Sequence, residues 1–394
     1  MIILAGGDLV LPDRVLSGGS LLIDDGRITG IEPGVVRPAG ADVREVTGLV
    51  IVPGFIDVHV HGVAGTDVLD GDEAVATVAA CLPRFGVTGF CPTSVACDPA
   101  TLATFLDAVA RARATPNPDA AVVLPAHLES NFINPAWNGA QPAECLRTFR
   151  GPAPDEAGAF TGDDILRVLH AEAASVGIVT IAPELDGGLD LLAVLRDRGH
   201  LVSIGHSGAS YEEAREAIRR GVTHATHLFN RMTPLTHRAP GVVGAVLEAP
   251  EVAVEIICDG AHVHPRVVAL ALRAASRDRV LAITDGTAAA GLAVGTRARL
   301  GGRTIVAGPR TATLEDGTLA GSVVTMDGAF RTLVREVGLS LDAAACVCAT
   351  SPAAHLGLAD RGRLEAGQRA DLVVMGPDLA VRQTWIAGRP VVEH

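Results

Sequence analysis

The chain has 394 residues, of which 48% are hydrophobic, so it can bury the large core of an α/β barrel with one appended domain. Its formal net charge of −13 argues against a nucleic-acid-binding protein and against an acidic membrane surface as partner, because both need clustered Lys or Arg. A phosphorylated small molecule remains compatible with this charge, since one local arginine can bind a phosphate.

The two ends of the chain have the same character, short strands separated by turns. Asp25-Gly26 lies between two alternating runs, which is a strong signal for a β-hairpin. Neither end is long enough to form a stable β domain alone. We therefore predict a small β-sandwich domain built from residues 1–52 and 360–394, with residues 53–359 inserted. The predicted amino-terminal strands are Ile2–Ala5, Leu9–Leu11, Ser20–Asp24, Arg27–Ile31 and Val50–Val52.

Signals for export, membrane insertion and disulfide formation are missing from the sequence. The first residues have neither the basic region nor the apolar run of a signal peptide, and no run of roughly 18 apolar residues occurs. The seven cysteines are scattered and have no paired framework. We therefore expect a cytoplasmic protein with reduced thiols.

The inserted segment alternates between strand-like and helix-like stretches, which predicts a (β/α)8 barrel as the catalytic domain. The eight predicted strands are 54–60, 87–92, 121–128, 177–183, 200–205, 222–227, 252–258 and 279–284. Helices are predicted at 72–85, 99–113, 162–175, 188–198, 210–220 and 264–276, with two more outside the barrel at 326–337 and 341–356.

A His-x-His pair ends the first barrel strand. His59 and His61 are two residues apart in Pro53-Gly-Phe-Ile-Asp-Val-His-Val-His-Gly62, so on a strand they point to the same side. Two imidazoles on one side can bind one divalent metal ion. The alternative is two hydrogen-bonded histidines in a polar turn, because this spacing often occurs by chance.

Further metal-binding residue types end four other predicted strands. These residues are Glu129, His206, His227 and Asp285. Each alone has a structural alternative, such as a buried hydrogen-bonded histidine, an ion pair or a helix cap. Together they favour a metal centre, because the carboxyl ends of barrel strands open on one face. Imidazole and carboxylate ligands suit one or two divalent ions, and we expect zinc first, with iron, manganese or cobalt also compatible.

This ligand set predicts a hydrolytic reaction. A bound metal lowers the pKa of water towards ~7 and polarises a carbonyl group. Asp285 could take the proton of the water and return it to a leaving amine. Glu129 could bridge two ions. One site would comprise His59, His61 and Asp285, and the other His206 and His227 with Glu129.

The motifs in combination resemble the amidohydrolase superfamily and, more closely, its N-acetylglucosamine-6-phosphate deacetylases. The resemblance implies hydrolysis of the acetamide of N-acetylglucosamine 6-phosphate to acetate and glucosamine 6-phosphate. It runs over nearly the whole chain. Its matching pieces are the His-x-His strand, His127-Leu-Glu129, Gly205-His206-Ser207, Thr226-His227-Leu228-Phe229-Asn230, Asp259-Gly260-Ala261-His262-Val263, Thr284-Asp285-Gly286 and Leu319-Ala320-Gly321-Ser322.

The resemblance also implies roles for individual residues. Glu129, His206 and His227 would be the shared metal ligands, His59 and His61 would admit a second ion, and Asp285 would be the catalytic acid and base. Arg238 falls where the family places its phosphate-binding arginine. Family members are usually homodimers, so the resemblance implies a homodimer in which the partner subunit contributes part of the phosphate site. The implied substrate-binding residues are Ala140, Gln141, Asn230, Arg231, Arg238, His262, Leu319, Ala320 and Gly321.

Two departures from the family pattern are present. Glu129 is followed by Ser130-Asn131, where many members have Gly-Pro. The Gly139-Ala140 turn continues with Gln141, where many members have a histidine that polarises the scissile carbonyl. The Gln141 amide can donate a hydrogen bond but is a weaker electrophile than an imidazolium.

Two other functions are compatible with the sequence. One is a different amidohydrolase that acts on another N-acyl amino sugar or on an N-acyl amino acid. The chain contains no lysine, so a carboxylated lysine cannot bridge two metals here. The other is a non-catalytic scaffold, which we rank low because every expected ligand is present.

Overall fold

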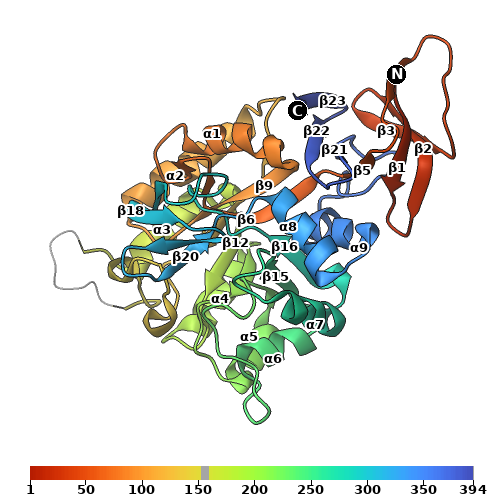
Figure 1. The fold of residues 1–394 in the computed structure, drawn as a ribbon. Helices are drawn as coiled ribbons and strands as arrows, with labels where there is room; N and C mark the ends of the chain where they lie inside the picture. The colour runs from red at the N-terminus through yellow and green to blue at the C-terminus, as the bar shows by residue number, and fades with distance from the viewer. Residues whose placement is uncertain (152–158, 394) are drawn as a thin grey trace.

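The structure is a computed structural model that describes residues 1–151 and 159–393. A barrel of parallel strands with helices around it occupies the middle of the chain, and an open sheet made from both chain ends lies beside it (Figure 1). Within the described residues, no helix combines the length and the apolar character needed to cross a membrane.

The predicted (β/α)8 barrel is confirmed, with eight parallel strands in the described part of the chain if β10 and β11 count as one interrupted strand. The barrel closes between its first and last strands, where Asp285 N donates to His59 O over 3.1 Å. The strands are β6 (Phe55–Val60), β9 (Val87–Ser94), β10 (Val122–Val123), β11 (Ala126–Glu129), β12 (Val176–Ile181), β13 (Leu201–Ile204), β14 (Val222–Ala225), β15 (Ala253–Ile257) and β16 (Val280–Ile283).

Helices connect successive strands, and several begin at caps visible in the sequence. The Asp98 side chain caps α2 by accepting from two backbone N–H groups, and Ser210 with Glu213 forms a capping box at α5. Helix α6 was not predicted, because it begins after Pro240 without a side-chain cap. The helices are α1 (Ala74–Cys81), α2 (Pro99–Ala114), α3 (Gly162–Ala171), α4 (Gly188–Asp197), α5 (Tyr211–Arg220), α6 (Gly241–Glu248) and α7 (Pro265–Ala275).

The last helical region packs against the outside of the barrel and against its amino-terminal end. Helix α8 (Met326–Thr332) continues as a π-helical segment to Val337. The predicted helix 341–356 is divided into α9 (Leu341–Ala345), a π-helical segment and α10 (Ser351–His355). Ala353 of α10 packs with the barrel-interior residues Ile56 and Leu281, so α10 covers the amino-terminal mouth of the barrel.

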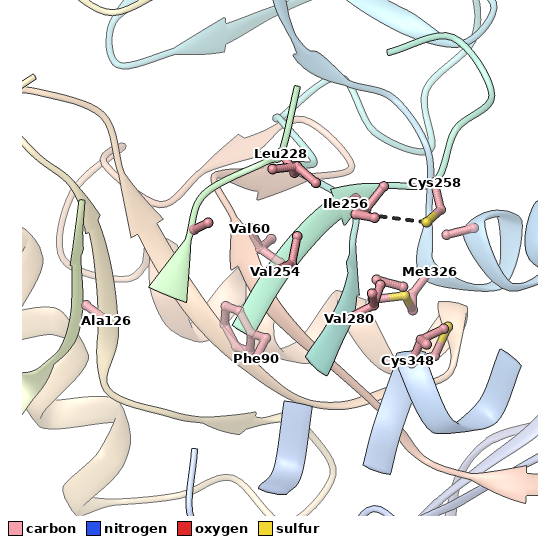
Figure 2. Close-up of a cluster of buried hydrophobic side chains, with 14 of the residues drawn as sticks. Val60, Phe90, Ala126, Leu228, Val254, Ile256, Cys258, Val280, Met326 and Cys348 are labelled. Carbon is pink, nitrogen blue, oxygen red and sulfur yellow. Dashed lines mark hydrogen bonds between the residues drawn. The ribbon is translucent and has the colours of Figure 1, made fainter. Parts of the chain in front are cut away.

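An apolar layer joins the outer face of the strands to these helices. Val254 and Ile256 on β15 point outward into this layer, where Cys258, Met326 and Cys348 also pack (Figure 2). Cys258 is 1% exposed, as expected for a core residue. Because side chains alternate along a strand, the residues between these positions on β15 face the barrel interior.

The open sheet contains strands from both chain ends, joined where β5 pairs antiparallel with β21. Asp25 and Gly26 form the predicted hairpin turn, with φ of 45° and 73°. The predicted strands Ile2–Ala5 and Leu9–Leu11 are instead one long, bulged strand, β1. The strands are β1 (Ile2–Val10), β2 (Val15–Asp24), β3 (Arg27–Glu32), β4 (Asp42–Glu45), β5 (Val50–Pro53), β21 (Leu372–Met375), β22 (Val381–Ile386) and β23 (Arg389–Glu393).

A small antiparallel sheet follows the last barrel strand and was not predicted as a unit. It reaches the barrel end, where Ser322 N donates to Asp285 O over 2.9 Å. Its strands are β17 (Arg297–Leu300), β18 (Arg303–Ala307), β19 (Thr311–Leu314) and β20 (Leu319–Ser322). A short hairpin, β7 (Gly62–Val63) and β8 (Thr66–Asp67), follows the first barrel strand.

Candidate metal centre and substrate cavity

Three of the predicted site residues share one local backbone geometry. His206, His227 and Asp285 each lie two residues beyond the last residue of their strand, with φ of 47°, 32° and 48°. L-residues rarely adopt this left-handed conformation, and it is found preferentially at functional sites. At Gly205 a Cβ would lie 2.8 Å from Thr226 Cβ, so only glycine allows the turn before His206.

One group of predicted ligands surrounds the carboxylate that ends β11. Glu129 Oε1 lies 2.8 Å from His206 Nε2 and 2.7 Å from His227 Nε2. The two Nε2 atoms are 3.0 Å apart. All three side chains are buried, so these atoms form a compact group of metal-binding type at the barrel mouth.

A second group lies on the other side of the same carboxylate. His59 Nε2 and His61 Nε2 are 3.2 Å apart. Asp285 Oδ1 is 3.4 Å from His59 Nε2 and 3.3 Å from His61 Nε2, and Glu129 Oε2 is 3.5 Å from His61 Nε2. Glu129 therefore lies between the two groups.

The hydrogen bonds on the far side of the imidazoles show that these groups fit a cation. His61 Nδ1 lies 2.9 Å from Thr93 O, and His206 Nδ1 lies 2.8 Å from Trp137 O. A carbonyl oxygen only accepts, so each Nδ1 carries the hydrogen. In the neutral rings each Nε2 then has a lone pair that faces an oxygen of Glu129. Two hydrogen-bond acceptors therefore face each other with no hydrogen between them. A divalent metal ion between them suits this donor set.

The electrostatics of the site likewise favour bound positive charge. Burial lowers the pKa of His61, but Asp285 and Glu129 outweigh burial and raise this pKa to about 10. Burial also lowers the pKa of His227, yet Glu129 chiefly raises it to about 9. Burial raises the pKa of Glu129, but its histidine neighbours, led by His206, hold this pKa well below its usual range.

A cavity opens above these residues. Most of the predicted residues line it. The metal-type residues in its wall are His61, Glu129, His206, His227 and Asp285, and the predicted substrate-binding residues are Ala140, Gln141, Asn230, Arg231, His262, Leu319 and Gly321. Four further lining residues were not predicted, namely Val95, Gly139, Ile257 and Leu300.

Two of the lining side chains are held by neighbouring residues. His262 Nδ1 lies 2.6 Å from Asp259 Oδ2, and this bond fixes the ring at the cavity wall. Gln141 Oε1 accepts from Ala96 N over 2.8 Å, and Gln141 Nε2 donates to Glu129 Oε2. The amide of Gln141 therefore contacts the carboxylate that joins the two ligand groups.

Three predicted residues do not line the cavity. His59 is fully buried, and Ala320 is buried in the sheet β17–β20. Arg238 is on the exposed loop 234–240 and does not line this cavity. Glu184, just beyond the end of the fourth barrel strand, accepts from Ser207 Oγ over 2.7 Å and so holds the loop after His206.

Comparison with known proteins finds a family and individual relatives that match nearly the whole chain. A model of the amidohydrolase family matches residues 50–391. A human N-acetylglucosamine-6-phosphate deacetylase is 36% identical over 396 residues, covering 96% of this chain and 94% of the human protein. An N-acetylgalactosamine-6-phosphate deacetylase of Escherichia coli O157:H7 is 32% identical and covers 97% of both chains. A solved structure of a Mycobacterium smegmatis N-acetyl-D-glucosamine-6-phosphate deacetylase variant, in complex with N-acetyl-D-glucosamine-6-phosphate, has a TM-score of 0.88 at 33% identity and covers 99% of both chains.

Proposed function

The chain belongs to the amidohydrolase family, and we propose that it hydrolyses the acetamide of N-acetylglucosamine 6-phosphate to acetate and glucosamine 6-phosphate. The observation that carries this proposal is the convergence of four imidazoles and two carboxylates at one end of the barrel, at the floor of one cavity. Relatives with this activity in their names align over nearly the whole chain, which supports the same substrate class.

We propose that Glu129, His206 and His227 hold one divalent ion and that His59 and His61 receive a second. A bound ion would supply Lewis-acid polarisation of the acetyl carbonyl and would make water a better nucleophile. Zinc is the first candidate, because imidazole and carboxylate are its usual ligands without thiolate. The choice among zinc, iron, manganese and cobalt rests on this donor chemistry alone.

Asp285 is the proposed proton carrier. Burial raises the pKa of Asp285, but the neighbouring imidazoles of His59 and His61 outweigh burial and lower it, so the group begins as a carboxylate. A carboxylate at the cavity floor can take the proton of the attacking water on Oδ1 and then give it to the leaving amine. Gln141 Nε2 donates to Glu129 Oε2, and Gln141 is proposed to orient the Glu129 carboxylate.

We propose that the active form is a homodimer in which Arg238 binds the phosphate group in the partner's cavity. Loop 234–240, which carries Arg238, is exposed throughout, and Leu235 within it is 54% exposed. Within one subunit Arg231 is the arginine that lines the cavity. The cytoplasmic location stays a prediction.

The test is acetate release by purified protein from four sugars: N-acetylglucosamine and N-acetylgalactosamine, each with and without the 6-phosphate. We expect turnover only with the phosphorylated sugars, and fastest with the gluco epimer. The galacto epimer is included because the Escherichia coli relative is named for it. A preference for the galacto epimer would correct the sugar, and release only from unphosphorylated acyl compounds would reject the proposal.

A further inference from the structure

A buried carboxylate lies directly beneath the candidate metal centre. Glu255 is in the middle of β15 and has 0% exposed surface. Its neighbours Val254 and Ile256 point outward into the apolar layer of Figure 2, so Glu255 points into the barrel. A carboxylate in such a place needs hydrogen-bond donors on both oxygens.

The two oxygens of Glu255 contact both ligand groups. Oε2 accepts from His59 Nδ1 over 2.9 Å and from His227 N over 3.1 Å. Oε1 accepts from His224 Nε2 over 2.8 Å, and His224 Nδ1 lies 2.8 Å from His355 Nε2. A hydrogen-bonded series therefore runs from α10, at the amino-terminal mouth of the barrel, to His59 at the candidate metal centre.

This series fixes where His59 carries its hydrogen. A carboxylate oxygen only accepts, so the ring nitrogen that faces Glu255 must be the protonated one. His59 Nε2 then keeps its lone pair and lies 3.4 Å from Asp285 Oδ1 and 3.2 Å from His61 Nε2. By the same reasoning, His224 has its hydrogen on Nε2 and accepts from His355 at Nδ1.

His127 also lies near Glu255, with its Nδ1 3.5 Å from Glu255 Oε1, but its closer partners lie elsewhere. Its Nδ1 donates to Val58 O over 3.2 Å, and its Nε2 lies 2.8 Å from Thr180 Oγ1. Its ring nitrogens are therefore satisfied by groups outside the ligand set. Glu255 differs, because its hydrogen bonds reach two of the proposed ligands directly.

We propose that Glu255 is a positioning residue of the metal centre, which holds His59 in the tautomer and orientation that bind a divalent ion. The inference rests on the proposed function, because it presumes that His59 and His61 receive an ion. Removing such a partner of a metal-bound histidine typically weakens metal binding by about 10- to 100-fold.

The test is Co²⁺ binding by the Glu255→Gln variant. Wild-type and variant protein are stripped with a chelator and titrated with Co²⁺, while the visible absorption of the bound ion and the ions per subunit are measured. We expect wild-type protein to bind two ions. The variant should bind one of them about tenfold or more weakly, with a changed absorption spectrum.

Two further variants test whether the effect on Co²⁺ binding is specific to the contact between Glu255 and His59. Asp371→Asn is the matched control, because Asp371 is also a buried carboxylate but accepts from Ala387 N and Arg369 in the open sheet. It should bind Co²⁺ like wild type. In a His59→Asn background, Glu255→Gln should have no further effect on metal affinity, because Glu255 acts through His59.

Two Co²⁺ ions bound by Glu255→Gln with wild-type affinity and spectrum would overturn this inference and leave the proposed function intact. A wild-type protein that binds fewer than two ions would remove the His59 site and the role of Glu255 with it. If Glu255→Gln does not fold, Glu255→Asp keeps the buried charge but withdraws the carboxylate from His59. Unchanged affinity for both ions in that variant would also reject the inference.

Discussion

At the scale of single residues, the site depends on backbone conformations that are uncommon for the residues that adopt them. His206, His227 and Asp285 all have positive φ, where an L-residue is strained. The strain turns the chain directly after a strand, so each side chain reaches the barrel mouth. The surrounding contacts must hold these conformations, and substitutions that disturb them should affect catalysis before they affect the fold.

Asp285→Asn should keep the fold and most of the bound metal but lose turnover by on the order of 10²-fold or more. Asn has the same shape but cannot carry the proton from water to amine. The measurement is kcat for acetate release together with metal content and thermal stability. Turnover close to wild type in a metal-loaded variant would remove Asp285 from the mechanism.

Gly321→Ala should reduce turnover by roughly tenfold or more, because a displacement of reacting groups by about 1 Å can cost ~10²-fold. A Cβ at Gly321, where φ is +64°, would lie 2.8 Å from Asp285 O. Gly317→Ala is the control, because Gly317 also has positive φ, +86°, but has nothing within 4 Å of its added Cβ.

Both variants should lose about 1 kcal/mol of unfolding free energy from the positive φ alone. Only Gly321→Ala should lose kcat, which is measured as acetate release at saturating substrate. Equal kcat in the two variants would mean that the contact with Asp285 has no catalytic importance.

The grouping of the candidate ligands at one barrel mouth could be predicted, because each lies at or just beyond the end of a recognisable strand. Glu255 was missed, although a charged residue inside the apolar run Ala253–Ile257 is a signal for a buried polar contact. Its partners are 196 and 31 residues away in sequence, at His59 and His224, so the pairing itself needs the three-dimensional structure.

At the scale of elements, strands and capped helices were predictable, and irregular connections were not. The alternation of apolar and helical segments predicts the barrel, and Asp98 and Ser210 mark two helix starts. The sheet β17–β20 lies in a Gly-rich segment with weak periodicity, so its pairing depends on long-range contacts. That sheet matters for function, because Leu300 and Leu319 line the cavity.

Arg303→Ala tests whether this sheet shapes the cavity. Arg303 Nη1 donates to Ala140 O over 2.9 Å, which joins β18 to the Gly139–Gln141 turn. Losing a hydrogen bond from a charged donor costs about 1.5 kcal/mol, so KM for the phosphosugar should rise by up to tenfold with little change in kcat.

The comparison variant for this experiment is Arg297→Ala. Arg297 is in the same sheet, but its side chain is 72% exposed and makes only a 3.5 Å ion pair with Glu315. Its kinetics should match wild type. If Arg303→Ala leaves KM unchanged, the sheet does not position the turn through this contact.

At the scale of the whole molecule, one subunit contains the proposed catalytic residue Asp285 but only part of the proposed phosphate site. Asp285 lies in the subunit's own cavity, whereas Arg238 lies on an exposed loop and does not line it. The homodimer proposed here would place one beside the other across an interface. Sequence alone could not distinguish this arrangement from a site within one chain, because it does not show where a loop points.

Mixing two inactive variants tests that arrangement. Asp285→Asn and Arg238→Ala subunits, dissociated and reassociated in equal amounts, should regain about a quarter of wild-type activity, because half of the dimers are mixed and each has one intact site. Separate variants treated in the same way are the control. Activity no higher than the average of the separate variants would mean that Arg238 does not act in its partner's site.

The central claim is that the cluster around Glu129 binds the metal on which deacetylation depends. Its most direct test is acetate release from N-acetylglucosamine 6-phosphate against metal bound per subunit, for wild type and Glu129→Gln. The account predicts that stripped wild-type protein is inactive and regains activity in proportion to bound metal. Glu129→Gln, which loses the carboxylate between both groups, should recover neither metal nor activity. Full acetate release by metal-free protein, or by Glu129→Gln, would contradict the account.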